Sequence, residues 1–139
     1  MERAVPVETC LGYLLYRDAI HLAAIKSNGV DWFLAGKING HNVTKNPKSQ
    51  EWIPFEIAFS YVQNIFTAEN TNEFNYTKDE DSTDPSSFHV IHNSHLIKPN
   101  PKRIMDISKL KHYRLKTVDN VMHIIAGDFS FNIVEAPQV

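Results

Sequence analysis

The chain has 139 residues, of which 42% are hydrophobic, with 8 Phe, 5 Tyr and 2 Trp, which is enough for one domain with its own core. A formal net charge of −2 gives no overall attraction to nucleic acid or to an anionic membrane. No stretch has the length of a transmembrane helix, no apolar signal region follows Met1, and the lone Cys10 forms no intramolecular disulfide. We therefore expect a single domain over 1–139, located in the cytoplasm.

The first strands are predicted from side chains that alternate between apolar and polar. Residues 11–17 form one such run, which ends at the Arg17-Asp18 turn. Residues 20–26 form the next, with Ile20, Leu22 and Ala24 on one face, because successive side chains of a strand point to opposite faces.

The next hairpin is predicted at Asn39-Gly40. Residues 30–38 alternate as a strand, with Trp32 and Leu34 on one face. Asn-Gly permits positive φ at both central positions of a tight turn, so we expect a further strand over 41–44.

Residues 55–66 fit two patterns. The aromatic and apolar residues alternate as in a strand, but they also form a helical stripe with Pro54 at a favourable first position. The short span and its four aromatic residues favour the strand.

The middle of the chain is expected to contain a mobile acidic loop near 70–85, with Asp79, Glu80 and Asp81 at its centre. A strand is expected within 87–97, and Pro99 and Pro101 then stop the pattern. Residues 104–112 are expected to hold one short helix.

The last quarter of the chain carries the clearest pattern. Residues 113–118, 121–126 and 129–134 read as three consecutive paired strands, joined by Asp119-Asn120 and Gly127-Asp128. The middle run is apolar on both faces apart from His123, which predicts an interior strand. The expected class is mainly β (or α+β): antiparallel meander sheets forming a sandwich or a partly open barrel, with at most one or two short helices.

Three histidines at steps of three, His89, His92 and His95, are the sharpest chemical feature. Imidazole is a ligand for zinc and copper. On a strand, however, residues three apart point to opposite faces. We therefore predict hydrogen-bonded or surface histidines and no tightly held metal.

Two further residues have a chemical reading. His123 as a general base would need an orienting carboxylate, for which Asp119 and Asp128 are the candidates, but a buried, hydrogen-bonded histidine is the preferred interpretation. Cys10 lies in no recognisable nucleophile motif. No common phosphate-binding or cofactor-binding motif is present, so we assign no catalytic residue and no cofactor and lean against an enzyme.

Charge is unevenly distributed along the chain. Seven of the 14 basic residues lie between Lys98 and Lys116, and among them Lys109, Lys111 and Arg114 are candidates for contact with a partner. A basic face can contact phosphates, and an acidic face such as Asp79-Glu80-Asp81 can meet a basic protein. Two solvated loops that partly neutralise each other are the plain alternative.

Residues 113–126, with 52–59 and 87–94, resemble a group of small, stand-alone, poorly characterised bacterial β-rich proteins. Some of these are regarded as immunity proteins of toxin systems. The resemblance implies a non-enzymatic binding protein whose partner is another protein, such as a toxin, and it transfers no active site. A nucleic-acid-binding module that uses 98–116 is the second hypothesis, and a small His-dependent hydrolase or metal-binding protein is the third.

Overall fold

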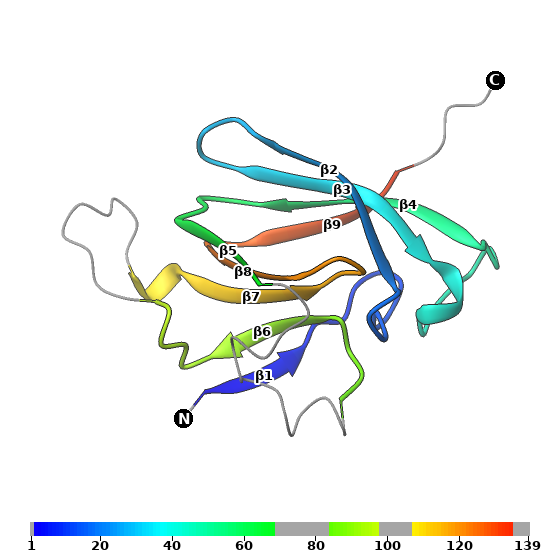
Figure 1. The fold of residues 1–139 in the computed structure, drawn as a ribbon, viewed down its shortest axis with the longest axis horizontal. Helices are drawn as coiled ribbons and strands as arrows, with labels where there is room; N and C mark the ends of the chain where they lie inside the picture. Colours follow the sequence, from blue (N-terminus) through cyan, green and yellow to red (C-terminus); the bar gives the residue numbers. More distant parts are fainter. Residues whose placement is uncertain (1, 69–83, 98–106, 135–139) are drawn as a thin grey trace.

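Two antiparallel sheets make up the fold (Figure 1). The computed structural model describes residues 2–68, 84–97 and 107–134. The five-stranded sheet has the order β1-β6-β7-β8-β5 and the four-stranded sheet the order β2-β3-β4-β9. The strands are β1 (Arg3–Pro6), β2 (Ile20–Ser27), β3 (Trp32–Asn39), β4 (Trp52–Phe59), β5 (Asn64–Ala68), β6 (Phe88–His92), β7 (Lys111–Lys116), β8 (Val121–Ala126) and β9 (Phe129–Ile133).

The predicted class is confirmed, since the described residues form two antiparallel sheets and only two short 3₁₀ helices, η1 (Gly40–Asn42) and η2 (Ile107–Lys109). Neither helix could span a membrane, and the described residues contain no other helix. Residues 104–106 of the predicted short helix, and 70–83 of the predicted acidic loop, lie outside the described residues.

The core fills the space between the sheets. Alternate residues of each strand point inward, so Tyr113 and Leu115 of β7 and Ile57 and Phe59 of β4 are fully buried. The rings of Phe59 and Tyr113, one from each sheet, have centroids 5.2 Å apart. Burial of this kind contributes about 1.5–3 kcal/mol for each large apolar side chain. Because alternate side chains fill the core, the remaining side chains of each sheet form its outer face, and both candidate sites lie on these outer faces.

The ambiguous segment 55–66 is extended, as favoured. It forms β4 in one sheet and β5 in the other, separated by a turn at which Tyr61 has φ 51°. The backbone N–H of Tyr61 donates to Asp31 Oδ1 at 3.1 Å, which holds this crossing. The helical alternative fails because the chain must leave one sheet and enter the other within four residues, 60–63.

One part of the predicted C-terminal meander is wrong. β7 and β8 pair as expected, but β9 pairs with β4 in the other sheet. The link Gly127-Asp128 is held by Ser60, whose carbonyl accepts from Gly127 N at 2.7 Å and whose N–H donates to Asp128 O at 2.9 Å. The edge of β8 that β9 would use is already paired with β5.

The predicted hairpin at Asn39-Gly40 is also wrong. Asn39 has φ −70° and caps η1, with its Oδ1 accepting from His41 N at 3.0 Å. No strand follows over 41–44, and 11–17 forms isolated bridges only, which join Gly12 to Thr9, Leu14 to Val43 and Leu15 to Ser86. These segments therefore brace each other across an end of the sandwich.

Ala24 does not share a face with Ile20 and Leu22, because β2 carries a bulge between Leu22 and Ala24. A Cβ atom on Gly36 would lie 2.0 Å from the carbonyl oxygen of His21. The backbones of β2 and β3 can therefore lie this close together only because residue 36 is glycine. The extra residue turns Ala24 to the outer face, opposite Ala35.

Candidate functional site

A row of polar residues crosses the outer face of the five-stranded sheet. His89 of β6 lies opposite Arg114 of β7, and Arg114 lies opposite His123 of β8. These side chains are 0%, 1% and 0% exposed, although they point away from the core between the sheets. Because ionisable groups are rarely buried without partners, the hydrogen bonds of this row decide what it can do.

The first hydrogen-bonded chain joins Asp84, His89 and Arg114. Asp84 Oδ2 lies 2.7 Å from His89 Nε2, and Arg114 Nη2 lies 2.9 Å from His89 Nδ1. A guanidinium only donates and a carboxylate only accepts. His89 must therefore be neutral, with its proton on Nε2, and it connects a buried cation to a carboxylate.

The electrostatics agree with this assignment. Burial, then the Arg114 charge, lowers the pKa of His89 from 6.5 to about 4, against the opposing effect of Asp84. Burial raises the pKa of Asp84, but hydrogen bonds from Ser86 and His89 outweigh it, so the net direction is downward. At neutral pH the chain thus has an ionised Asp84, a neutral His89 and a charged Arg114.

The second chain joins Ser94, His112 and His123. Ser94 Oγ lies 2.6 Å from His112 Nδ1, and His112 Nε2 lies 2.8 Å from His123 Nδ1. Burial, then the charges of His123 and Arg114, lowers the pKa of His112 to about 3. Burial and Arg114 lower the pKa of His123 to about 4. His123 is therefore oriented by a histidine, and neither Asp119 nor Asp128 has the role suggested by the sequence.

A hydroxyl next to two linked imidazoles resembles a nucleophile with its base. Here, however, the imidazoles are buried and poorly basic, whereas a general base is most effective with a pKa near the working pH. Within the described residues, no group of three His, Cys, Asp or Glu side chains could hold a metal ion. The arrangement is suited to holding three strands in register.

The predicted histidine triplet separates in space. His89 is buried in the polar row, whereas His92 and His95 are exposed, and His95 Nε2 lies 3.0 Å from Glu2 Oε1. Sequence reasoning missed His112, Ser94 and Asp84 as members of the two chains. The alternation of 111–116 was a usable signal, since it places His112, Arg114 and Lys116 on one face of β7.

The second candidate site is exposed and lies on the outer face of the four-stranded sheet. Trp52 at the start of β4 is 38% exposed there. Its ring meets the His21 ring edge-on, with centroids 4.9 Å apart, and Lys37 Nζ lies 4.5 Å from the ring centroid. The indole is thus held by a cation and an imidazole while one side stays open to solvent.

Three cross-strand rows of side chains share this face with the indole. His21, Lys37 and Pro54 form one cross-strand row, and Ala24, Ala35 and Glu56 form the next. The third row contains Lys26, Phe33, Ala58 and Ser130. Small side chains (Pro54, Ala24, Ala35, Ala58 and Ser130) thus alternate on this face with the longer ones of Lys26, Phe33, Lys37 and Glu56. We call this surface, defined by these three rows with Trp52, the Trp52 face.

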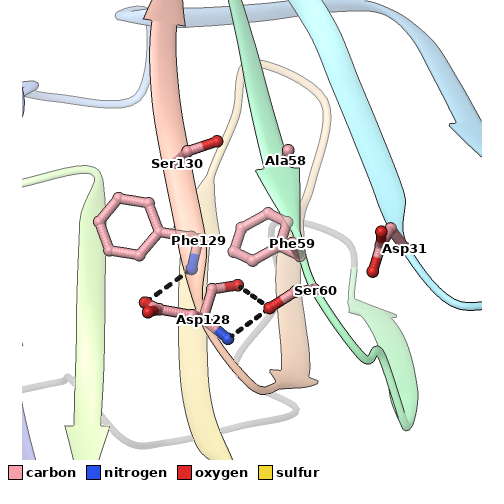
Figure 2. A pocket seen from close by; sticks show the side chains of 7 residues that line it. All are labelled: Asp31, Ala58, Phe59, Ser60, Asp128, Phe129 and Ser130. Carbon is pink, nitrogen blue, oxygen red and sulfur yellow. Dashed lines mark hydrogen bonds between the residues drawn. The ribbon is translucent and has the colours of Figure 1, made fainter.

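A small pocket of about 220 Å³ lies where the chain crosses between the sheets, and Figure 2 shows its lining. Its two carboxylates are both used by the backbone: Asp31 accepts from Tyr61 N, and Asp128 accepts from Phe129 N at 2.9 Å. Ser60 Oγ donates to Asp128 O and accepts from Asp128 N. These contacts fix the crossing, and we assign no ligand to the pocket.

The predicted partner-binding residues do not form one exposed surface in the part of the chain that the structure describes. Lys109 and Lys111 are exposed, but Arg114 is only 1% exposed and thus lies away from any surface that they form. Asp79, Glu80 and Asp81 lie outside the described residues, so their role stays a prediction. Cys10 is exposed and is not part of a disulfide.

No family model, curated protein or solved structure matches this chain significantly.

Proposed function

We propose that this protein is a non-enzymatic binding protein that engages a partner protein through the Trp52 face. The observation that carries this proposal is the exposed indole of Trp52, which contacts His21 and Lys37 on the outer face of the four-stranded sheet. Tryptophan is enriched among the residues that dominate interface energies. An indole fixed before binding loses little conformational freedom on association.

The buried polar row favours a binding protein over an enzyme. Its imidazoles are neutral and shielded, and their lowered pKa values make them weak bases at neutral pH. The same row stiffens the five-stranded sheet behind the Trp52 face, because its hydrogen bonds link β6, β7 and β8.

The class of partner follows from the resemblance described above, which suggests a bacterial immunity or inhibitor protein acting on a toxin. Lys26 and Lys37 outnumber Glu56 on the Trp52 face, so an acidic patch on the partner would complement it. A cytoplasmic location belongs to the same proposal.

The nucleic-acid hypothesis has less support. Of the described basic residues in 98–116, Arg114 and Lys116 are 1% and 6% exposed. Of the basic residues that the structure describes in this segment, Lys109 and Lys111 are at the surface, and two cations alone make a weak phosphate-binding site. Outside the described residues lie Lys98, Lys102 and Arg103.

The test is affinity capture from the native host, followed by reconstitution of the captured complex from purified components. Trp52→Ala should abolish capture or weaken the purified complex by at least tenfold, which corresponds to about 1.4 kcal/mol. The matched control is Phe66→Ala, because Phe66 is also an aromatic residue on a strand with 38% exposure, but it lies on the other sheet.

Equal loss of binding in the Trp52→Ala and Phe66→Ala variants would contradict the Trp52 face. Capture of nucleic acid alone, lost when Lys109 and Lys111 are neutralised, would favour the second hypothesis. Reversing Asp79, Glu80 and Asp81 to Lys tests the acidic loop separately: slower association in this variant alone would move the interface there.

A further inference from the structure

Among the described strands, β9 pairs with β4 on one side only, and backbone groups of β9 point toward its other edge. Val134 N donates to Pro54 O at 2.9 Å, and Ser60 N donates to Asp128 O, so the even-numbered residues face β4. In an antiparallel strand, alternate residues direct both backbone groups to the same side. The N–H and C=O groups of Phe129, Phe131 and Ile133 therefore face the edge. Of these groups, the N–H of Phe129 already donates a hydrogen bond to the Asp128 carboxylate.

Two of the other three edges of the described sheets, β1 and β2, carry features that discourage the addition of a strand. β1 is four residues long and contains Pro6. β2 contains the bulge after Leu22 and the charged Lys26, and its Ile20 carbonyl already accepts from Val118 N at 3.1 Å. β9 has no proline, no charged residue and no register shift against β4. Such an unprotected edge is a template for another strand. The third of the other edges, β5, has no proline, charge or register shift either, but its sequence Asn-Ile-Phe-Thr-Ala is not complementary to itself.

The sequence of β9 is complementary to itself in the antiparallel sense. With Phe131 at the centre, Phe129 lies opposite Ile133 and Ser130 lies opposite Asn132. Apolar residues thus meet apolar residues on the inner face, and polar residues meet polar residues on the outer face. The same register places the outward backbone groups of Phe131 directly opposite each other, as a hydrogen-bonded pair requires.

We propose that two copies of this chain associate through β9, antiparallel and in this register, to join their four-stranded sheets into one continuous sheet. A twofold axis passes beside Phe131, and the contact is isologous and closed. About four to six ladder hydrogen bonds form between the copies. Ile133 and Val134, now 41% and 46% exposed, become partly covered.

The absence of charge in β9 supports a second copy over an unrelated strand. A charged edge would repel an identical one, whereas 129–134 contains no ionisable side chain. The dimer also brings two Trp52 faces onto one side of a single sheet. The proposal stands without the proposed function, because it uses the strand edge and not the indole.

The first test measures the mass of the full chain by sedimentation velocity across a range of concentrations. The expected result is twice the monomer mass at high concentration. Ile133→Pro should make the protein monomeric without unfolding it, because the N–H lost at this position faces the edge and takes no part in the β4 ladder. Ile133→Ala, which keeps that N–H, is the matched control and should retain a dimer.

The second test exchanges charge at the outer-face positions. Ser130→Asp with Asn132→Asp, and Ser130→Lys with Asn132→Lys, should each be monomeric, because the proposed register sets like charges opposite each other. An equimolar mixture of the two double variants should recover the dimer. Circular dichroism and thermal melting check that each variant is folded.

Three outcomes would overturn the proposal. One is a wild-type protein that remains monomeric at every concentration. Another is a dimer that persists in Ile133→Pro and in both charged variants, which would place the contact elsewhere. The third is a mixture of the charged variants that stays monomeric while both are folded, which would exclude this register.

Discussion

Arg114 and His89 lie directly opposite each other on β7 and β6, and the guanidinium donates to Nδ1 of His89 at 2.9 Å. This contact connects the buried charge of Arg114 to the carboxylate of Asp84 through one neutral imidazole. A charge that leaves water needs a partner of this kind, because desolvation costs several kcal/mol per ion. The stability of the five-stranded sheet therefore depends on all three groups together.

Replacing Arg114 should destabilise the protein strongly. Arg114→Met leaves His89 without its donor and should lower the free energy of unfolding by about 3–5 kcal/mol, as measured by urea denaturation. Lys111→Met, at an exposed position of the same strand, should change it by less than about 0.5 kcal/mol. Equal effects of the two substitutions would show that the buried row contributes nothing specific.

The same substitution has a spectroscopic readout. The Arg114 charge helps to lower the pKa of both His89 and His123. In folded Arg114→Met, both pKa values should therefore rise toward 6.5, as followed by NMR titration of the imidazole protons. Unchanged values would mean that burial alone sets them.

Stability should fall on acidification. His89, His112 and His123 have folded-state pKa values of about 4, 3 and 4, whereas 6.5 is expected when the chain unfolds. Below pH 6.5 the unfolded state binds more protons than the folded state, so the free energy of unfolding is highest above pH 6.5 and decreases as the pH approaches 4. Between pH 7 and pH 4.5 the loss should exceed about 2 kcal/mol, since one pKa unit is worth about 1.4 kcal/mol.

Two variants separate this effect from general acid sensitivity. His123→Gln keeps a hydrogen-bonding side chain but has no proton to gain, so the loss between pH 7 and pH 4.5 should become smaller. His92→Gln combined with His95→Gln changes only exposed side chains and should leave the loss as in the wild type. A pH dependence that is the same in all three proteins would argue against the buried histidines as its source.

The bulge in β2 makes a specific demand on Gly36. Gly36→Ala places a Cβ atom 2.0 Å from His21 O and 2.9 Å from Leu22 Cα, both of which are backbone atoms. The strands must separate, so we expect a loss of roughly 1–3 kcal/mol, measured by thermal or urea unfolding. Ala35→Ser, at the neighbouring outward-facing position, should cost less than about 0.5 kcal/mol. A neutral Gly36→Ala would show that β2 can shift freely.

The interior strand β8 should be sensitive to loss of volume. Ile124 is fully buried, and Ile124→Ala should cost roughly 2–5 kcal/mol in chemical denaturation. Val118→Ala, at a 38% exposed turn position, is the matched control and should cost less than about 0.5 kcal/mol. Similar small losses at both positions would mean that β8 is not central to the core.

The sequence by itself determined that the chain is mainly β and where most of the longer strands lie, because a period of two in side-chain polarity is a local property of the chain. It placed 121–126 as an interior strand, favoured strand over helix for 55–66, and predicted that His89 and His92 point to opposite faces. Each of these follows from how a pleated backbone directs successive side chains.

The tertiary structure alone decided which strands are neighbours. The turn Gly127-Asp128 looks like a hairpin, but β9 crosses to β4 because β8 is already paired with β5 and because Ser60 holds the crossing. The polar row likewise joins residues from β6, β7 and β8, and the Trp52 face joins β2, β3, β4 and β9. Pairing between strands distant in sequence depends on contacts that a local pattern does not encode, so both candidate sites became visible only in the folded chain.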